Sequence, residues 1–159
     1  MKITILCVGK IKEDYLRAAV AEYEKRLGRY ATIEIIEVDD EKTSDKSSER
    51  EDELIREREG ERLLRHIPDQ AYVVALAIGG KEYSSVEFAD KIEKLGVDGV
   101  SHIVFIIGGS IGLSTEVLGA ADDRVSFSRM TFPHQLMRVI LLEQIYRAAR
   151  IIRGEPYHK

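Results

Sequence analysis

Two short runs of almost unbroken apolar residues place the strongest constraint on how this chain can fold. They are AYVVALAI at 71–78 and HIVFII at 102–107. Short runs without polar alternation are typical of strands that are buried on both faces of a parallel sheet. Since parallel strands need a long crossover connection, helices are expected between such runs.

The rest of the chain supplies matching elements, because strand-like and helix-like segments alternate along its length. Further strands are predicted at 2–9, 32–38 and 125–128, and helices at 13–29, 49–66, 85–95, 114–121 and 133–153. Residues 39–50 are expected to form a loop and residues 79–85 a turn. This alternation predicts an α/β fold, a mainly parallel sheet with helices on both faces. With no internal repeat or linker, residues 1–159 are expected to form a single domain.

The last predicted helix is apolar around well more than half of its circumference. Its sequence is PHQLMRVILLEQIYRAARIIRG. A helix that covers one face of a sheet needs an apolar stripe of only ~100°. The surplus can be buried inside the monomer or against a second copy of the chain, and for a small domain we favour a two-fold dimer.

Several classes of protein are disfavoured by what the chain contains. No apolar run reaches the ~18 residues that span a bilayer, and the N-terminal segment is interpreted as a strand rather than a signal peptide. The single Cys7, between Leu6 and Val8, is expected to pack in the core and fits a reducing cytosol. The four histidines lack metal-ligand spacing, so no metal site is expected.

The segment IIGGSIGLS at 106–114 places three glycines directly after a predicted strand. A phosphate-binding P-loop would need a lysine followed by Ser or Thr, and here Leu113-Ser114 follows Gly112. The spacing also differs from the dinucleotide fingerprint G-x-G-x-x-G. The glycines therefore predict either a tight turn or the close approach of a different ligand.

Three segments taken together resemble one family. They are IIGGSIGLS (106–114), FSRMTFPHQLMRVILLEQIYRA (127–148) and RGEPYHK (153–159), and the segments ITILCVGKIKEDY and REREGERLL fit as well. The chain resembles the RlmH family, the small SPOUT-class methyltransferases that methylate N3 of a pseudouridine in 23S ribosomal RNA. The resemblance implies a C-terminal trefoil knot, a homodimer, and S-adenosylmethionine (SAM) bound in a bent form beside the partner subunit.

The family's cofactor contacts carry over onto eight positions at or just after the ends of three predicted strands. They are Leu76, Gly108, Phe127, Ser128, Arg129, Met130, Thr131 and Phe132. Ligands of parallel α/β sheets lie at the carboxyl ends of the strands, so the strand pattern and the resemblance point to the same edge.

The chemistry that the resemblance implies needs help with one proton, because the acceptor N3–H is weakly acidic. A general base, or a cation that stabilises the anion, would assist. The candidates are His134, Arg147, Tyr157 and His158. His134 could instead pack at the start of its helix, whereas Tyr157 and His158 lie in a short tail with little core to join.

The charge of the chain is uneven, with a net of −9 over residues 1–123 and +5 over residues 124–159. The basic part is consistent with two interpretations, a partner surface or solvated helix faces. A thin basic stripe of Arg138, Arg147, Arg150, Arg153 and Lys159 predicts weak binding to naked RNA. The resemblance implies a cytoplasmic enzyme that acts on 23S rRNA in the assembled ribosome. The alternatives are a ribosome-associated SAM-binding module without turnover and, disfavoured by the missing fingerprint, a nucleotide-dependent oxidoreductase.

Overall fold

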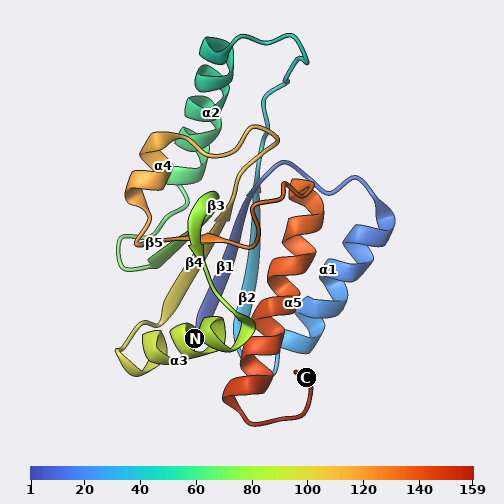
Figure 1. The fold of residues 1–159 in the computed structure, drawn as a ribbon, viewed down its shortest axis with the longest axis vertical. Coiled ribbons are helices and arrows are strands. Elements are labelled where there is room, and N and C mark those ends of the chain that lie inside the picture. Colours follow the sequence, from blue (N-terminus) through green and yellow to red (C-terminus); the bar gives the residue numbers. More distant parts are fainter.

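The computed structural model describes all residues from 1 to 159, and its elements alternate as the sequence predicts (Figure 1). The strands are β1 (Lys2–Val8), β2 (Thr32–Val38), β3 (Tyr72–Glu82), β4 (His102–Ile107) and β5 (Asp123–Ser126). The helices are α1 (Asp14–Leu27), α2 (Glu49–Leu64), α3 (Ser85–Val97), α4 (Thr115–Ala120) and α5 (His134–Ile152). The strands form one sheet in the order β2-β1-β4-β3-β5 with every pairing parallel, which confirms the predicted α/β fold.

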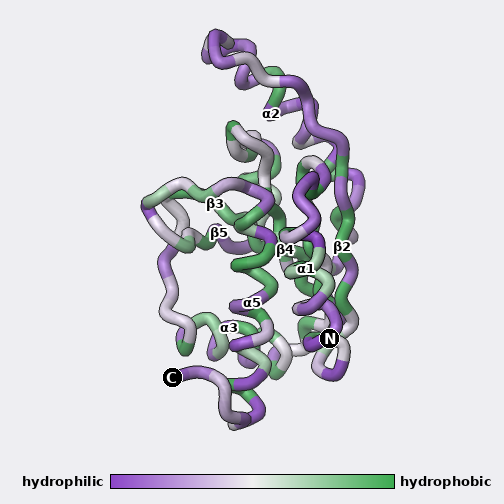
Figure 2. Tube along the Cα trace, turned by 90° about the vertical axis from the view of Figure 1, so that its right-hand side faces the viewer, coloured by the Kyte–Doolittle hydropathy of each residue, from purple (hydrophilic) through white to green (hydrophobic).

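Each face of the sheet is covered by its own set of helices, which explains why the central strands are apolar throughout. Ile3, Ile5 and Cys7 of β1 join the larger core with α1, α3 and α5. Leu6 and Val8 of the same strand join a second core with α2 and α4. Figure 2 shows the hydrophobic segments gathered in the sheet and α5, and the hydrophilic ones over α2 and the loop before it.

Cys7 is fully buried in the larger core, as predicted. Burial raises the pKa of its thiol to about 12. A thiol in this environment stays protonated, so its role is packing.

The predicted turn at 79–85 is wrong in its first half, because β3 continues to Glu82. Leu76 and Lys81 are both paired with Val125, so β3 bends back around β5. Gly80 permits this approach: a Cβ there would lie 2.8 Å from the carbonyl carbon and oxygen of Arg124. Gly79 has a φ of +89°, a conformation that other residues rarely adopt.

Helix α5 lies on the sheet with α1 and α3 packed against it (Figure 1). Leu141, Leu142, Ile145 and Ala148 are buried in the core that it shares with α1 and α3. Many of its other apolar side chains are half-buried against the same core. Much of the apolar surplus is thus covered within one chain, and the dimer stays a prediction.

No helix is long and apolar enough to cross a membrane. The structure also contains no group of three or more His, Cys, Asp or Glu side chains arranged to hold a metal ion.

Candidate cofactor and catalytic sites

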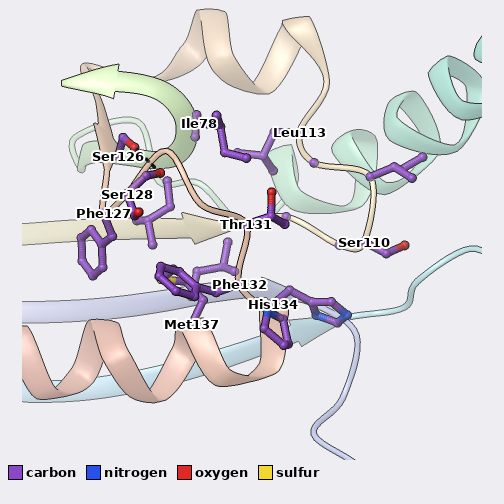
Figure 3. A pocket seen from close by; sticks show the side chains of 18 of the residues that line it. Ile78, Ser110, Leu113, Ser126, Phe127, Ser128, Thr131, Phe132, His134 and Met137 are labelled. Carbon is purple, nitrogen blue, oxygen red and sulfur yellow. Dashed lines mark hydrogen bonds between the residues drawn. The ribbon is translucent and has the colours of Figure 1, made fainter. Parts of the chain in front are cut away.

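A cavity of about 810 Å³ opens at the carboxyl ends of β4 and β5, beside the middle of β3 where that strand bends. Its walls come from the middle of β3, the glycine segment after β4 and the segment between β5 and α5 (Figure 3). Seven of the eight predicted cofactor residues line it, namely Leu76, Gly108, Phe127, Ser128, Met130, Thr131 and Phe132. Arg129 is exposed and is not among the lining residues.

The glycine segment folds back on itself after β4. Gly112, with a φ of +85°, donates its N–H to the carbonyl of Gly109 at 3.1 Å. A Cβ on Gly108 would lie 2.9 Å from the carbonyl carbon of Gly112 and 3.0 Å from its oxygen. The glycine at 108 is therefore required by the turn itself, and the same backbone forms one wall of the cavity. The two interpretations of this segment are compatible.

Helix α2 supports the glycine segment from outside, a role that the sequence analysis missed. Arg56 lines the cavity and donates from Nη1 to the carbonyl of Ile111 at 3.2 Å. Gly60 lies so close to Ser114 that a Cβ there would be 2.5 Å from its Oγ. A glycine inside a highly charged helix was the available signal, because such a residue often marks a close packing contact.

Glu59 is a buried carboxylate between α2 and the glycine segment. Its Oε2 accepts the N–H of Glu41 at 3.0 Å, whereas its buried Oε1 has no partner. Burial raises the pKa of this carboxyl. A Cβ on Gly109 would lie 3.2 Å from Oε1, so this position also favours glycine.

The segment after β5 is held in shape by its own hydroxyls. Ser126 donates from Oγ to the carbonyl of Ser128 at 3.0 Å, and Ser128 Oγ accepts the N–H of Met130 at 3.0 Å. Phe127 packs edge-on against Phe88 of α3 with the ring centroids 6.2 Å apart. Figure 3 shows Thr131 and Phe132 on the same stretch of chain, which leads into His134.

The lining suits a cofactor that carries no phosphate. Arg56 is the only Lys or Arg side chain among the lining residues, and it is already bonded to a backbone carbonyl. Apolar side chains such as Leu76, Ile78 and Leu113 offer contact area for a flat base. The exposed backbone of the glycine segment can supply close donors and acceptors.

His134 is the one catalytic candidate that lines this cavity. Its Nδ1 is buried without a partner, and its Cε1 lies 3.7 Å from where a Cβ on Gly9 would be. Burial and, to a lesser extent, the positive charge of Arg138 lower the pKa of the imidazole. His134 is thus neutral near pH 7 and can accept a hydrogen bond.

The other three candidates gather at the opposite end of α5. Arg147 Nη2 lies 2.5 Å from Glu143 Oε1, and its Nη1 lies 3.1 Å from Nδ1 of His158. Tyr157 donates to Glu143 Oε1 at 3.0 Å and lies beneath the Arg147 guanidinium. His134 and Arg147 are 13 positions apart on the helix, about 20 Å along its axis. One chain therefore does not bring the four candidates together.

Glu143 organises this second cluster and was not among the candidates. It accepts hydrogen bonds from both Arg147 and Tyr157. Burial and, to a lesser extent, the hydrogen bond to Glu143 raise the pKa of the Tyr157 phenol, so this group stays protonated at neutral pH and donates a hydrogen bond. The spacing of Glu143 and Arg147, four residues apart on a helix, was the signal that could have found it.

The predicted basic stripe is wrong as a continuous surface. Arg138 is only 2% exposed and is not on the surface at all. Arg147 and Arg150 are ion-paired with Glu143 and Glu155. Of the five predicted cations, Arg153 and Lys159 alone form no ion pair.

Arg138 instead ties together three elements beneath His134. Its Nη1 donates to Glu37 of β2 at 2.6 Å, and its Nη2 donates to the carbonyl of Gly9, directly after β1, at 3.1 Å. Glu37 is 34% exposed, so the two ends of this ion pair differ in their contact with water.

Because of this difference in exposure, removing Glu37 and removing Arg138 should lower the free energy of unfolding by different amounts. Glu37→Ala should destabilise the fold by about 3–5 kcal/mol, because it leaves a buried guanidinium without its counter-charge. Arg138→Met should cost less, since the remaining carboxylate still reaches water. The double variant should be more stable than Glu37→Ala alone. Urea unfolding of the three proteins measures these differences.

A matched control is available on the same strand, where Glu34 pairs with Lys2 at 3.6 Å and both side chains are well exposed. Glu34→Ala should change the free energy of unfolding by less than about 1 kcal/mol. Equal costs for Glu37→Ala and Arg138→Met would contradict the assignment of Arg138 as the buried partner.

The fold and the cavity define an α/β protein that can hold a nucleoside-like cofactor at the carboxyl ends of its parallel strands. Comparison with known proteins narrows this class. The family model described as "Predicted SPOUT methyltransferase" matches residues 1–158. The chain therefore belongs to the SPOUT methyltransferase family.

Close relatives match over the full length of both chains. The Ribosomal RNA large subunit methyltransferase H of Clostridium beijerinckii is 58% identical over 159 residues, and the protein of the same name from Bifidobacterium adolescentis is 60% identical over 159 residues. Among solved structures, a probable methylase family protein from Haemophilus influenzae Rd KW20 has a TM-score of 0.55 at 14% identity. That match covers 99% of this chain and 70% of the other chain, and it bears on the fold alone.

Proposed function

We propose that this protein transfers a methyl group from SAM to N3 of a pseudouridine in the 23S rRNA of the large subunit, within the assembled ribosome. The observation that carries the proposal is the cavity at the ends of β4 and β5 and the bend of β3, which seven of the eight expected cofactor residues line. The full-length relatives that are named as large-subunit rRNA methyltransferases support the substrate class. The whole chain, 1–159, acts as one domain in the cytoplasm, where its ribosomal substrate is found.

The residues of the cavity fit SAM. Its adenosine would lie between the glycine segment and the segment 127–132, with Leu76 beside it. SAM brings an already activated methyl group on a sulfonium, so the protein has to position the acceptor and exclude water. The scarcity of free cations in the cavity suits a cofactor that is itself positively charged at sulfur.

The acceptor nitrogen must lose its proton. Two sites of the chain can assist this step, His134 at the cavity and the cluster around Arg147. The neutral His134 at the cavity can accept a hydrogen bond or the proton itself. Arg147 can stabilise the developing anion. Tyr157 acts as a hydrogen-bond donor, since burial raises its phenol pKa. His158 follows Tyr157 in the C-terminal tail, and its Nδ1 lies within hydrogen-bond distance of Arg147 Nη1.

These roles require two copies of the chain, because about 20 Å of helix separates His134 from the Arg147 cluster. In the proposed homodimer, the tail of one subunit reaches the cavity of the other. The expected trefoil knot belongs to the same proposal. Val125 is paired to both Leu76 and Lys81, so β3 bends around β5 just before the chain leads into α5, and this bend supports the proposal.

Transfer of labelled methyl from SAM to ribosomes that lack this modification tests the function directly. We expect stoichiometric incorporation into 23S rRNA, at a pseudouridine when the product is digested to nucleosides. SAM binding without incorporation would instead favour a ribosome-associated binding module. Binding of NADH in place of SAM would favour an oxidoreductase.

A further inference from the structure

Two arginines with no acidic partner share the ring of one tyrosine at the end of the molecule that carries the C-terminal tail (Figure 1). The guanidinium of Arg29, just after α1, lies 5.2 Å from the centroid of the Tyr30 ring. The guanidinium of Arg153, just after α5, lies 5.4 Å from the same centroid. Both arginines are exposed, and neither forms an ion pair.

The surroundings of Tyr30 leave these two charges uncompensated. Glu155 is the acidic group here. Its Oε2 forms an ion pair with Arg150 at 2.5 Å and accepts a hydrogen bond from the Tyr30 hydroxyl at 2.7 Å. Arg150 also donates to the Tyr30 hydroxyl at 3.0 Å and to the carbonyl of Pro156 at 2.9 Å. The hydrogen bond from the Tyr30 hydroxyl, together with the charges of Arg150, Arg29 and Arg153, holds the pKa of the Glu155 carboxyl below its usual value. Three cations therefore surround one anion, and the two outer ones face solvent.

We infer that Arg29 and Arg153 form a docking site for phosphates of the rRNA backbone. Guanidinium groups bind phosphate through two parallel N–H donors, and stacking on an aromatic ring fixes their orientation in advance. Tyr30 is itself fixed by its hydroxyl bonds and by its edge-on contact with Tyr146, 6.1 Å between centroids. The site is thus a rigid pair of charges rather than two mobile side chains.

The location of this site suits the proposed function, on which the inference rests. The hydrogen bonds from Arg150 to Glu155 and Pro156 fix the tail directly ahead of Tyr157 and His158. Phosphates held by Arg29 and Arg153 would place the RNA beside the two tail residues that are proposed to touch the substrate. The site also replaces the predicted basic stripe, whose other arginines are engaged within the chain.

The dependence of the binding constant for ribosomes on salt concentration distinguishes phosphate contacts from other contacts, and we use ribosomes that lack the modification as the binding partner. For Arg29→Ala/Arg153→Ala we expect binding on the order of tenfold weaker near 0.1 M salt. The slope of the logarithm of the association constant against the logarithm of the salt concentration is negative, and its magnitude should decrease by about 1.4. This decrease corresponds to two phosphate contacts on single-stranded RNA. SAM affinity should not change, because neither arginine lines the cavity.

Helix α2 and its C-cap, in the half of the molecule away from the C-terminal tail, provide a control with the same change of charge (Figure 1). Arg58 and Arg65 are also exposed and form no ion pair. Arg58→Ala/Arg65→Ala should leave the slope nearly unchanged. A second variant, Tyr30→Leu, keeps both arginines but removes the aromatic ring that orients them. Its affinity for the ribosome should therefore be lower than that of the wild type.

Equal losses for the two arginine pairs would overturn the inference, because net charge alone would then explain the effect. Arg153 also borders a mainly apolar hollow of about 380 Å³, so a second copy of the chain is the competing occupant. A fall in molecular mass of Arg29→Ala/Arg153→Ala in solution would assign the arginines to a subunit contact and overturn the inference as well. If the wild-type protein neither binds nor methylates the ribosomes, the proposed function itself fails. Normal methylation with an unchanged salt slope in the variant removes the docking site alone.

Discussion

Gly108→Val is expected to abolish measurable SAM binding and methyl transfer, with a loss of affinity on the order of 100-fold or more. A Cβ at this position would lie 2.9 Å from the carbonyl carbon of Gly112 and 3.0 Å from Leu113 Cδ2. The carbonyl oxygen of Gly112 is also 3.0 Å away, so two of the three nearest atoms belong to the backbone of the turn and the glycine segment has to move as a whole. Its displacement removes the wall on which the cofactor is proposed to lie. Titration calorimetry with SAM measures the loss.

The α4 helix offers a matched control for the smaller substitution. Gly119 has open space around its Cβ position, so Gly119→Ala should leave SAM affinity unchanged. Gly108→Ala should already weaken binding, although less than the valine variant does. The molecular mass in solution should be the same for all of these proteins. Normal SAM affinity in Gly108→Val would remove the proposed cofactor site.

The sheet could be predicted from the sequence because burial on both faces leaves a local signature. The runs at 71–78 and 102–107 are apolar throughout, and the structure places β3 and β4 at these runs inside the sheet. Residues 79–82 were missed because two glycines usually indicate a turn. Here they let β3 bend and approach the backbone of Arg124, a contact with a residue more than 40 positions away.

Arg138 shows where reasoning from residue type failed although the spacing was informative. An arginine was expected at the surface, yet His134, Arg138, Leu141, Ile145 and Ala148 recur at intervals of three and four. That periodicity places Arg138 on the core-facing stripe of α5. Its partners, Glu37 and Gly9, are 101 and 129 residues away, so no local pattern could predict the pairing.

The cavity was predicted in outline because strand ends meet at one edge of a parallel sheet. Its support by α2 was not, because Arg56 and Glu59 sit in a helix whose composition is typical of a solvated surface. The separation of the catalytic candidates also needed the structure. Sequence distance along α5 gives about 20 Å, but only the packed tail shows that Tyr157 and His158 fold onto Arg147 and Glu143 of their own helix rather than toward His134.

Truncation after Gly154 is expected to lower the rate of methyl transfer by about 1,000-fold, within the range that loss of general-acid or general-base groups produces. SAM affinity should stay within about twofold, because no residue after Met137 lines the cavity. The variant Lys159→Ala serves as the control for the last residue and should be nearly as active as the wild type. Turnover of the truncated chain at the full rate would show that Tyr157 and His158 do not act on the substrate. Loss of SAM affinity would assign the tail to the cofactor site instead.

A mixture of two inactive chains tells whether the tail acts within its own subunit or across the dimer. The truncated chain keeps an intact cavity, and Gly108→Val keeps an intact tail. If the tail acts across the dimer, a co-expressed heterodimer has one complete site, and an equal mixture should recover about a quarter of the wild-type activity, given random pairing. If the tail acts within its own subunit, neither chain has a complete site and no activity returns. The length of α5 predicts recovery, because one chain cannot bring its Arg147 cluster to His134 without giving up the helix that holds both.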